Sequence, residues 1–316
     1  ADLQARVMSF IHSVGEHATL NARNNIIANL QSDDLAFVPT SAPTPCWLPK
    51  FEDAEGWLPM ESCLLNVRRL AEFIQGVDHA DESVVQEKSG RLFSTFGMPY
   101  AYDSEAQCPR FLQYLEGVQP DEHDRGVLQR LAGLSLIPET KYNVFFLLYG
   151  QPGTGKSVFL YVLRHLVGEP NICTLPLAGI DDKFSSWELT TSLLNICGDL
   201  PLETEGGSLK RVEGMLKELC DGGMIRTERK FRDGGQAPAV ARMVFACNTL
   251  PHFADTTGAL HDRMRIIPFQ QRFRGTDAEN PDLRYELVEN ELPGIFNWAI
   301  EGLGRLLGER FFPEHS

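Results

Sequence analysis

The residues best suited to chemistry form one glycine-rich stretch near the middle of the chain. Its eight residues match the spacing G-x-x-x-x-G-K-S: Gly150, Gln151, Pro152, Gly153, Thr154, Gly155, Lys156 and Ser157. Glycines at this spacing let successive backbone N–H groups point at one phosphate. Lys156 can reach β- and γ-phosphate oxygens, and the Ser157 hydroxyl can bind Mg²⁺. Because the stretch follows an apolar run, a chance glycine turn is the weaker reading, and we predict a nucleoside triphosphate site.

Two polar residues follow later apolar runs, at the points where buried strands should end. Asp199 follows residues 192–198, and Asn248 follows residues 241–247. The carboxyl ends of parallel strands line the edge where ligands bind. Asp199 is therefore the candidate for holding Mg²⁺, with Glu203 and Glu205 just beyond it as carboxylates that could orient water. The Asn248 amide could contact the γ-phosphate or orient the attacking water, although asparagine also favours turns after strands. An ordinary loop aspartate remains the alternative for Asp199.

Two arginines lie downstream of Asn248. Arg263 follows it by fifteen residues, and Arg265 is its near competitor. A guanidinium stabilises charge on a transferring phosphoryl group, and such arginine fingers raise rates by about 10³–10⁵. The alternative for Arg263 is a surface arginine on a short helix.

A basic segment lies in a chain whose formal net charge is −14. Residues 224–232 carry a net charge of +3 and include Phe231, and Gly234 and Gly235 supply a turn. Clustered cations bind nucleic-acid phosphates, and an aromatic ring can stack on a base. The alternative is a solvated edge hairpin with Phe231 packed inward. The candidate DNA-binding residues are Arg229, Lys230 and Arg232.

The fold class follows from short apolar runs that alternate with helical patterns after Lys141. This alternation predicts an α/β fold with a parallel sheet, in which the glycine-rich stretch follows the first strand. Strands are expected within residues 142–150, 171–177, 192–200, 241–248 and 265–269. Helices are expected at residues 157–167, 208–220 and 258–263.

Three regions are expected along the chain. Residues 1–125 should form a mainly helical N-terminal region, with a helical pattern over 1–40, a proline-rich irregular stretch over 39–60, and a strand running into a helix over 62–76. Residues 126–275 should form the core, and residues 276–316 a helical tail of two segments.

The composition excludes several classes of protein. The chain has 316 residues, of which 43% are hydrophobic and 23% charged, so disordered, collagen-like and coiled-coil classes do not fit. No apolar run reaches the ~18–20 residues of a membrane span, and the N-terminus lacks the pattern of a signal peptide. The seven cysteines are scattered without a CxxC pair, as in the reducing cytoplasm. The start without Met suggests a piece of a longer protein.

The order of these features resembles the superfamily 3 helicases of the phage and plasmid primase–helicase family, which are related to poxvirus primase–helicases. The segments that carry the resemblance are GQPGTGKSVFL, SLLNICGDLP, LKELCDGGMIRTERKF, MVFACNTLP and DRMRIIPF. The resemblance covers about residues 100–310, is strongest over 141–270 and is weak or absent over 1–95.

The resemblance implies an AAA+ ATPase that assembles into a ring, usually a hexamer, and unwinds DNA during replication of a phage, plasmid or other mobile element. It implies ATP and Mg²⁺ as cofactors and single-stranded or forked DNA as the partner. Gly150–Ser157 would be the Walker A loop, Asp199 the Walker B acid, Asn248 the sensor amide and Arg263 an arginine finger for the neighbouring subunit. The loop is less rich in asparagine than is common in the family, and Asp199 stands where a glutamate is frequent.

Two other functions fit the same residues. One is an ATP-dependent loader or remodeller in which DNA contact is incidental. The other is an assembly protein that binds nucleotide without hydrolysing it. A small-molecule kinase fits less well, because no acceptor-site motif is present.

Overall fold

The computed structural model describes residues 44–77, 83–176, 186–198, 206–227, 235–251, 253, 257–277 and 279–312. The chain divides into two units, residues 1–54 with 90–93, and the rest. The described part of the first unit is a three-stranded antiparallel sheet in the order β2-β1-β6. Its strands are β1 (Cys46–Trp47), β2 (Glu52–Asp53) and β6 (Leu92–Phe93). The predicted 1–40 helix lies outside the described residues.

The second unit begins with another small antiparallel sheet, in the order β3-β4-β5. Asn66 ends β4 and caps helix α3, because its side-chain oxygen accepts a hydrogen bond from the Arg69 N–H at 3.0 Å. This confirms the predicted strand that runs into a helix. The elements are β3 (Trp57–Pro59), β4 (Leu64–Asn66), α3 (Val67–Ile74) and β5 (Val85–Gln86).

Described residues 44–93 are therefore less helical than expected for the N-terminal region. They contain six strands of two or three residues and one helix. Prolines recur between residues 39 and 59, and each lacks the N–H that an α-helix needs and restricts the residue before it. The helical part of this region begins at Pro109.

A five-stranded parallel sheet in the order β13-β7-β12-β9-β8 forms the core of the second unit, which confirms the predicted α/β class. The glycine-rich stretch follows β7, which lies inside the sheet between β12 and β13. The strands are β7 (Phe145–Tyr149), β8 (Ile172–Cys173), β9 (Leu194–Cys197), β12 (Arg242–Cys247) and β13 (Met264–Pro268). All five lie within the predicted ranges except for Met264, one residue early.

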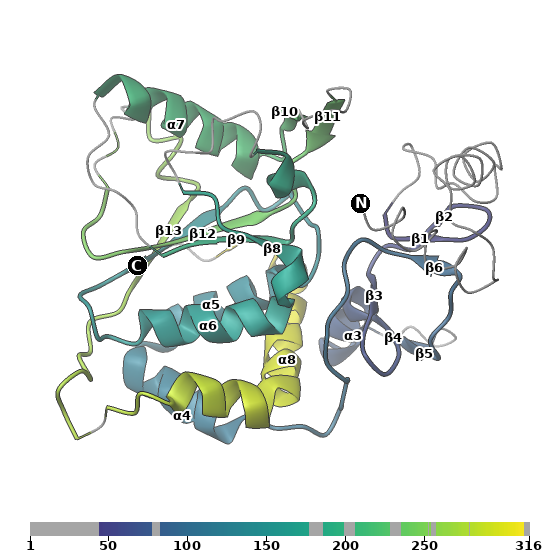
Figure 1. Cartoon of the computed structure of the whole chain (residues 1–316), viewed down its shortest axis with the longest axis horizontal. Helices are drawn as coiled ribbons and strands as arrows, with labels where there is room; N and C mark the ends of the chain where they lie inside the picture. Colours follow the sequence, from purple (N-terminus) through teal and green to yellow (C-terminus); the bar gives the residue numbers. More distant parts are fainter. Residues whose placement is uncertain are drawn as a thin grey trace, which may run out of the picture. The chain divides into compact units, whose positions relative to one another are not determined.

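Helices cover both faces of the sheet (Figure 1). Side chains on a strand alternate between faces, so Phe145 and Leu147 pack on the side of α7, whereas Phe146 and Leu148 pack on the side of the other helices. Both sets are buried, which explains the continuous apolar run of β7. The helices are α4 (Pro109–Val118), α5 (Glu122–Leu134), α6 (Lys156–Val167), α7 (Gly206–Cys220) and α8 (Leu283–Glu309).

Two predicted elements differ from the structure. Residues 258–263 form a bend and turns instead of a helix and lead directly into β13. Gly258 has φ +78°, which lies outside the right-handed helical region. The predicted two-segment tail is one helix, α8, with Pro293 inside it. A proline removes one hydrogen bond and bends a helix without ending it where neighbours hold both halves; Figure 1 shows α8 changing direction along its length. No helix in the described ranges is long and apolar enough to cross a bilayer.

Helices α5 and α8 approach closely because of a glycine. A Cβ on Gly133 would lie 2.3 Å from the Ala299 carbonyl oxygen and 2.5 Å from the Leu303 nitrogen. Both are backbone atoms, so neither can move aside alone. We expect Gly133→Ala to lower the free energy of unfolding by about 1–3 kcal/mol, the usual cost of overpacking.

Denaturant unfolding would measure this loss. The control is Gly308→Ala on the other helix of the pair, α8, where no atom lies within 4 Å of the added carbon. It should stabilise the protein by about 0.5–1 kcal/mol through helix propensity. Equal stabilisation by both substitutions would contradict the close approach.

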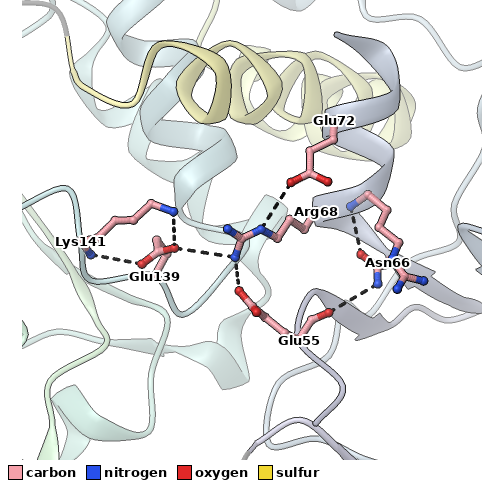
Figure 2. Close-up of polar contacts among 7 residues, drawn as sticks. Glu55, Asn66, Arg68, Glu72, Glu139 and Lys141 are labelled. Carbon is pink, nitrogen blue, oxygen red and sulfur yellow. Dashed lines mark hydrogen bonds and ion pairs between the residues drawn. The ribbon is translucent and has the colours of Figure 1, made fainter. Parts of the chain in front are cut away.

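A network of charges ties α3 to the segment that enters β7 (Figure 2). Arg68 pairs with Glu55, lies 3.6 Å from Glu72 and 3.9 Å from Glu139, and Lys141 lies 2.9 Å from Glu139. Partial burial would raise the pKa of Glu139, but hydrogen bonding to Lys141 and the charges of Lys141 and Arg68 together hold that pKa below its usual value. The carboxylate is therefore ionised at neutral pH, and it joins α3 to the segment that leads into β7.

Candidate nucleotide site

The loop that joins β7 to α6, residues 150–157, is shaped by its glycines; we call it the phosphate loop. Gly153 has φ +86° and Gly155 has φ +95°, in the left-handed region that favours glycine. A Cβ on Gly153 would lie 2.4 Å from the Cβ of Arg274, and one on Gly155 would lie 2.6 Å from Val118 Cγ1. Only glycine fits at both positions. The loop thus leads directly into the N-terminus of α6, where N–H groups attract an anion.

The Lys156 side chain turns back into the phosphate loop. It is 8% exposed, and its ammonium group donates hydrogen bonds to the carbonyl oxygens of Gly150 and Gln151, the latter at 3.0 Å. A further bond of 3.4 Å reaches Asn248 Oδ1. The structure therefore brings together two of the predicted site residues. They meet because β12 pairs with β7, and the Gly150 N–H donates to the Cys247 carbonyl oxygen at 3.1 Å.

The Cys247 thiol lies near enough to this ammonium group to feel its charge. Burial raises the pKa of the Cys247 thiol to about 11, against the opposing effect of the Lys156 charge. The thiol is therefore protonated and uncharged at neutral pH. Thr154 is buried and its hydroxyl donates to the Gln151 carbonyl oxygen at 2.8 Å, which stiffens the loop. Ser157 is exposed in the first turn of α6, where its hydroxyl is open to a metal ion.

Helix α4 supports the phosphate loop from outside. The buried Tyr114 hydroxyl donates to the Gly155 carbonyl oxygen at 2.9 Å, and burial raises the pKa of Tyr114 well above its ordinary value. The N-terminus of α4 is in turn capped from α8, because Glu291 accepts N–H bonds from Arg110 at 3.0 Å and Phe111 at 2.8 Å. Sequence reasoning did not identify these supports.

Arg263 lies at the opposite edge of the sheet from the phosphate loop of its own chain. Its carbonyl oxygen accepts a hydrogen bond of 2.9 Å from the N–H of Phe145, the first residue of β7, whereas the loop follows the last. Four residue steps along β7 amount to about 13 Å. The Arg263 guanidinium forms two bonds of 2.9 Å with the Asp221 carboxylate and one of 2.7 Å with the Ala259 carbonyl oxygen. The structure thus does not bring Arg263 to Lys156 of the same chain.

Arg265, the alternative finger, lies within β13. Its guanidinium donates hydrogen bonds to the carbonyl oxygens of Asp262 at 2.8 Å and Met264 at 3.2 Å. These bonds hold it against the residues at the start of β13.

Several predicted site residues lie outside the described residues. Asp199 follows β9 by two residues, and Glu203 and Glu205 also lie outside. The basic hairpin is described at its base only, where β10 (Met224–Thr227) and β11 (Gly235–Pro238) pair antiparallel. The candidate DNA-binding residues Arg229, Lys230 and Arg232 fall in the interval between these strands and are not described. The described part of the chain thus offers Ser157 as an oxygen ligand for Mg²⁺.

Comparisons with known proteins match the region that holds the site. Residues 148–264 match a family described as a family of unknown function, DUF5906. That range spans all the predicted catalytic positions, from the phosphate loop to Arg263. The chain is also 23% identical over 171 residues to a protein of Invertebrate iridescent virus 3 named "Putative helicase 121R", covering 50% of this chain and 18% of that protein.

Solved structures share the fold. Two apo structures of the C-terminal region of NrS-1 match with TM-scores of 0.51 and 0.50, at 14% and 15% identity. They cover 71% and 75% of this chain, which spans 54% and 62% of theirs. The chain therefore spans only part of the length of these proteins.

Proposed function

We propose that this chain is an ATP-driven DNA helicase or translocase that acts in the replication of a phage, plasmid or other mobile element. The observation that carries the proposal is the phosphate loop at the carboxyl edge of a parallel sheet, with Lys156 in contact with Asn248. The similarity to a viral protein named as a helicase supports the choice among the many uses of such a loop.

Each residue at this edge has a role in hydrolysis. Lys156 would leave the loop carbonyl oxygens to bind the β- and γ-phosphates, and Ser157 with Asp199 would hold Mg²⁺. Asn248 would contact the γ-phosphate or orient the attacking water. Its amide is neutral, so it can do so without repelling the phosphates.

Arg263 would complete the site of a neighbouring copy. Its position at the far edge of the sheet supports action between subunits, because its own phosphate loop is about 13 Å away along β7. Of the five guanidinium N–H groups, three make the bonds to Asp221 and Ala259. Among the described residues, one N–H on each terminal nitrogen has no acceptor and could donate to a phosphate. A ring of copies, which we propose to be a hexamer, provides such a neighbour for every site.

The basic hairpin would contact DNA inside the ring. Its base is formed by β10 and β11, and the residues between them carry Arg229, Lys230 and Arg232. In a chain with a net charge of −14, this positively charged segment would attract a DNA strand. One such hairpin from each copy in a ring would concentrate positive charge near the ring axis. Screening over ~8–10 Å separates that axis from the acidic outer surface.

The experiment that tests DNA translocation is the double substitution Lys230→Ala with Arg232→Ala. We expect loss of strand displacement and of DNA-stimulated ATP hydrolysis, with basal hydrolysis within about twofold of wild type because the phosphate loop is untouched. Loss of two phosphate contacts should lower the slope of log affinity against log salt for single-stranded DNA by about 1.4.

The matched control is Lys88→Ala with Arg305→Ala, which removes the same charge from two exposed positions outside the hairpin. It should leave displacement and the salt slope unchanged. A hairpin variant that keeps full DNA-stimulated hydrolysis would favour an ATP-dependent loader or remodeller.

A further inference from the structure

The chain that follows β13 runs alongside the phosphate loop. The Phe269 N–H donates to the Tyr149 carbonyl oxygen at 2.6 Å, and a Cβ on Gly150 would lie 2.1 Å from the Phe269 carbonyl oxygen. Farther on, the Gly153 carbonyl oxygen accepts N–H bonds from Phe273 at 2.9 Å and from Arg274 at 3.3 Å. These backbone bonds fix the segment, residues 269–274, in register with the loop.

Two side chains of this segment have different roles: Phe273 packs into the core, and Arg274 lies against the phosphate loop. The Phe273 ring packs toward α4, with its Cζ 3.6 Å from where a Cβ on Gly117 would lie, and joins the main apolar core. Arg274 places its Cβ, Cγ and Cδ within 2.4–3.3 Å of the Cβ position of Gly153. The arginine stem therefore lies directly on the phosphate loop.

The Arg274 guanidinium is exposed, and within the described ranges it makes no hydrogen bond or ion pair. An arginine side chain spans roughly 6 Å, about four or five bond lengths. From a Cβ that touches Gly153, that length reaches the N–H groups at which the loop would bind phosphate. A guanidinium is suited to such an anion, since it can donate two parallel N–H bonds to phosphate oxygens.

We propose that Arg274 is a second phosphate-binding cation of the nucleotide site, acting on the nucleotide held by its own chain. It would bind the β- and γ-phosphates from the side of Gly153, while Lys156 binds them from inside the loop. The inference rests on the proposed function, because it needs a nucleotide in the phosphate loop. It differs in kind from the role of Arg263, which serves a neighbouring copy.

Arg272 provides a matched control two residues earlier in the same segment. It is exposed and carries the same charge, but the three atoms nearest to the Gly153 Cβ position all belong to Arg274. Long-range attraction would be shared by both arginines, whereas direct contact would belong to Arg274 alone.

The test is equilibrium binding of fluorescent ATP, ADP and AMP, with Mg²⁺, to wild type, Arg274→Ala, Arg274→Lys and Arg272→Ala. We expect Arg274→Ala to weaken ATP binding about 10-fold or more, as for a lost charged hydrogen bond. ADP binding should weaken less and AMP binding not at all. Arg274→Lys should recover part of the affinity, and Arg272→Ala should bind ATP within about twofold of wild type.

The outcomes separate this inference from the proposed function. If wild type and Arg274→Ala bind ATP equally well, the inference about Arg274 is overturned and the proposed function is not. Equal weakening by Arg272→Ala and Arg274→Ala would also overturn it, in favour of a general charge effect. Wild type that binds no ATP would overturn the proposed function itself. Thermal unfolding of each variant shows whether weaker binding comes from a folding defect or from the lost contact. If Arg274→Ala is unstable, Arg274→Lys takes its place in the comparison.

Discussion

Lys156→Ala should reduce ATP hydrolysis by at least 10²–10³-fold, the usual cost of removing one preorganised donor to a transition-state charge. The Lys156 ammonium is 8% exposed and is held between loop carbonyl oxygens and Asn248, so no other described lysine can replace it there. Phosphate release at saturating ATP and Mg²⁺ measures the effect. Unfolding of the variant should be checked, because the lost side chain bridges the loop and β12.

The control for this substitution is Lys88→Ala, which removes an exposed lysine far along the sequence. It should hydrolyse ATP at the wild-type rate. Turnover by Lys156→Ala close to that of wild type would show that the phosphate loop is not the catalytic site. Wild type that binds ATP without turnover would instead identify a nucleotide-gated assembly protein.

Arg263→Ala should lower hydrolysis by about 10³–10⁵-fold while ATP binding is retained. Binding should be retained because Arg263 lies at the amino edge of the sheet and cannot reach the phosphate loop of its own chain. Hydrolysis should fall because the neighbouring copy's site would lose the guanidinium that stabilises the transferring phosphoryl group. Binding and single-turnover hydrolysis, measured on the same preparation, separate the two effects. Hydrolysis at the wild-type rate would contradict the assignment of Arg263 to a neighbouring site.

Mixing two inactive variants gives the sharper test of the same assignment. Lys156→Ala copies keep Arg263, and Arg263→Ala copies keep Lys156, so a mixed assembly should regain part of the activity. Arg305→Ala, an exposed arginine on α8, should be active alone. The hydrolysis rate of Asp221→Asn should lie between the rates of wild type and Arg263→Ala, because Asp221 holds the guanidinium by two hydrogen bonds of 2.9 Å. No recovery on mixing would argue against a shared site.

Much of the central sheet could be predicted because its strands are buried on both faces. β7 and β12 read as unbroken apolar runs, since alternate side chains enter two separate cores. The edge strand β8 is only two residues long, whereas the apolar run that predicted it covers residues 171–177. The length of an apolar run alone does not show how many of its residues pair with a neighbouring strand.

Elements that depend on distant contacts could not be predicted. α8 continues past Pro293 because helices α3, α5 and α6 pack against it, and nothing near Pro293 in the sequence signals this. The six short strands before residue 94 carry too few residues for a period to be visible.

The site divides in the same way. The phosphate loop is a contiguous motif, and Asn248 follows an obvious strand, so both were predicted and are found in contact. Tyr114, Glu291 and Arg274 reach the loop or its support from far along the sequence, without a local pattern that marks them. Asp199 and the hairpin cations remain predictions.

The placement of Lys156 and Arg263 near opposite ends of β7 has a consequence for the stoichiometry of the site that we propose. In the shared site that we propose, one copy would carry part of each of two different sites, so an open row of copies would contain one complete site fewer than its number of members. Closing the row would supply the missing site and make every copy equivalent. Specific activity should therefore fall on dilution more steeply than for an enzyme whose catalytic groups all reside in one chain.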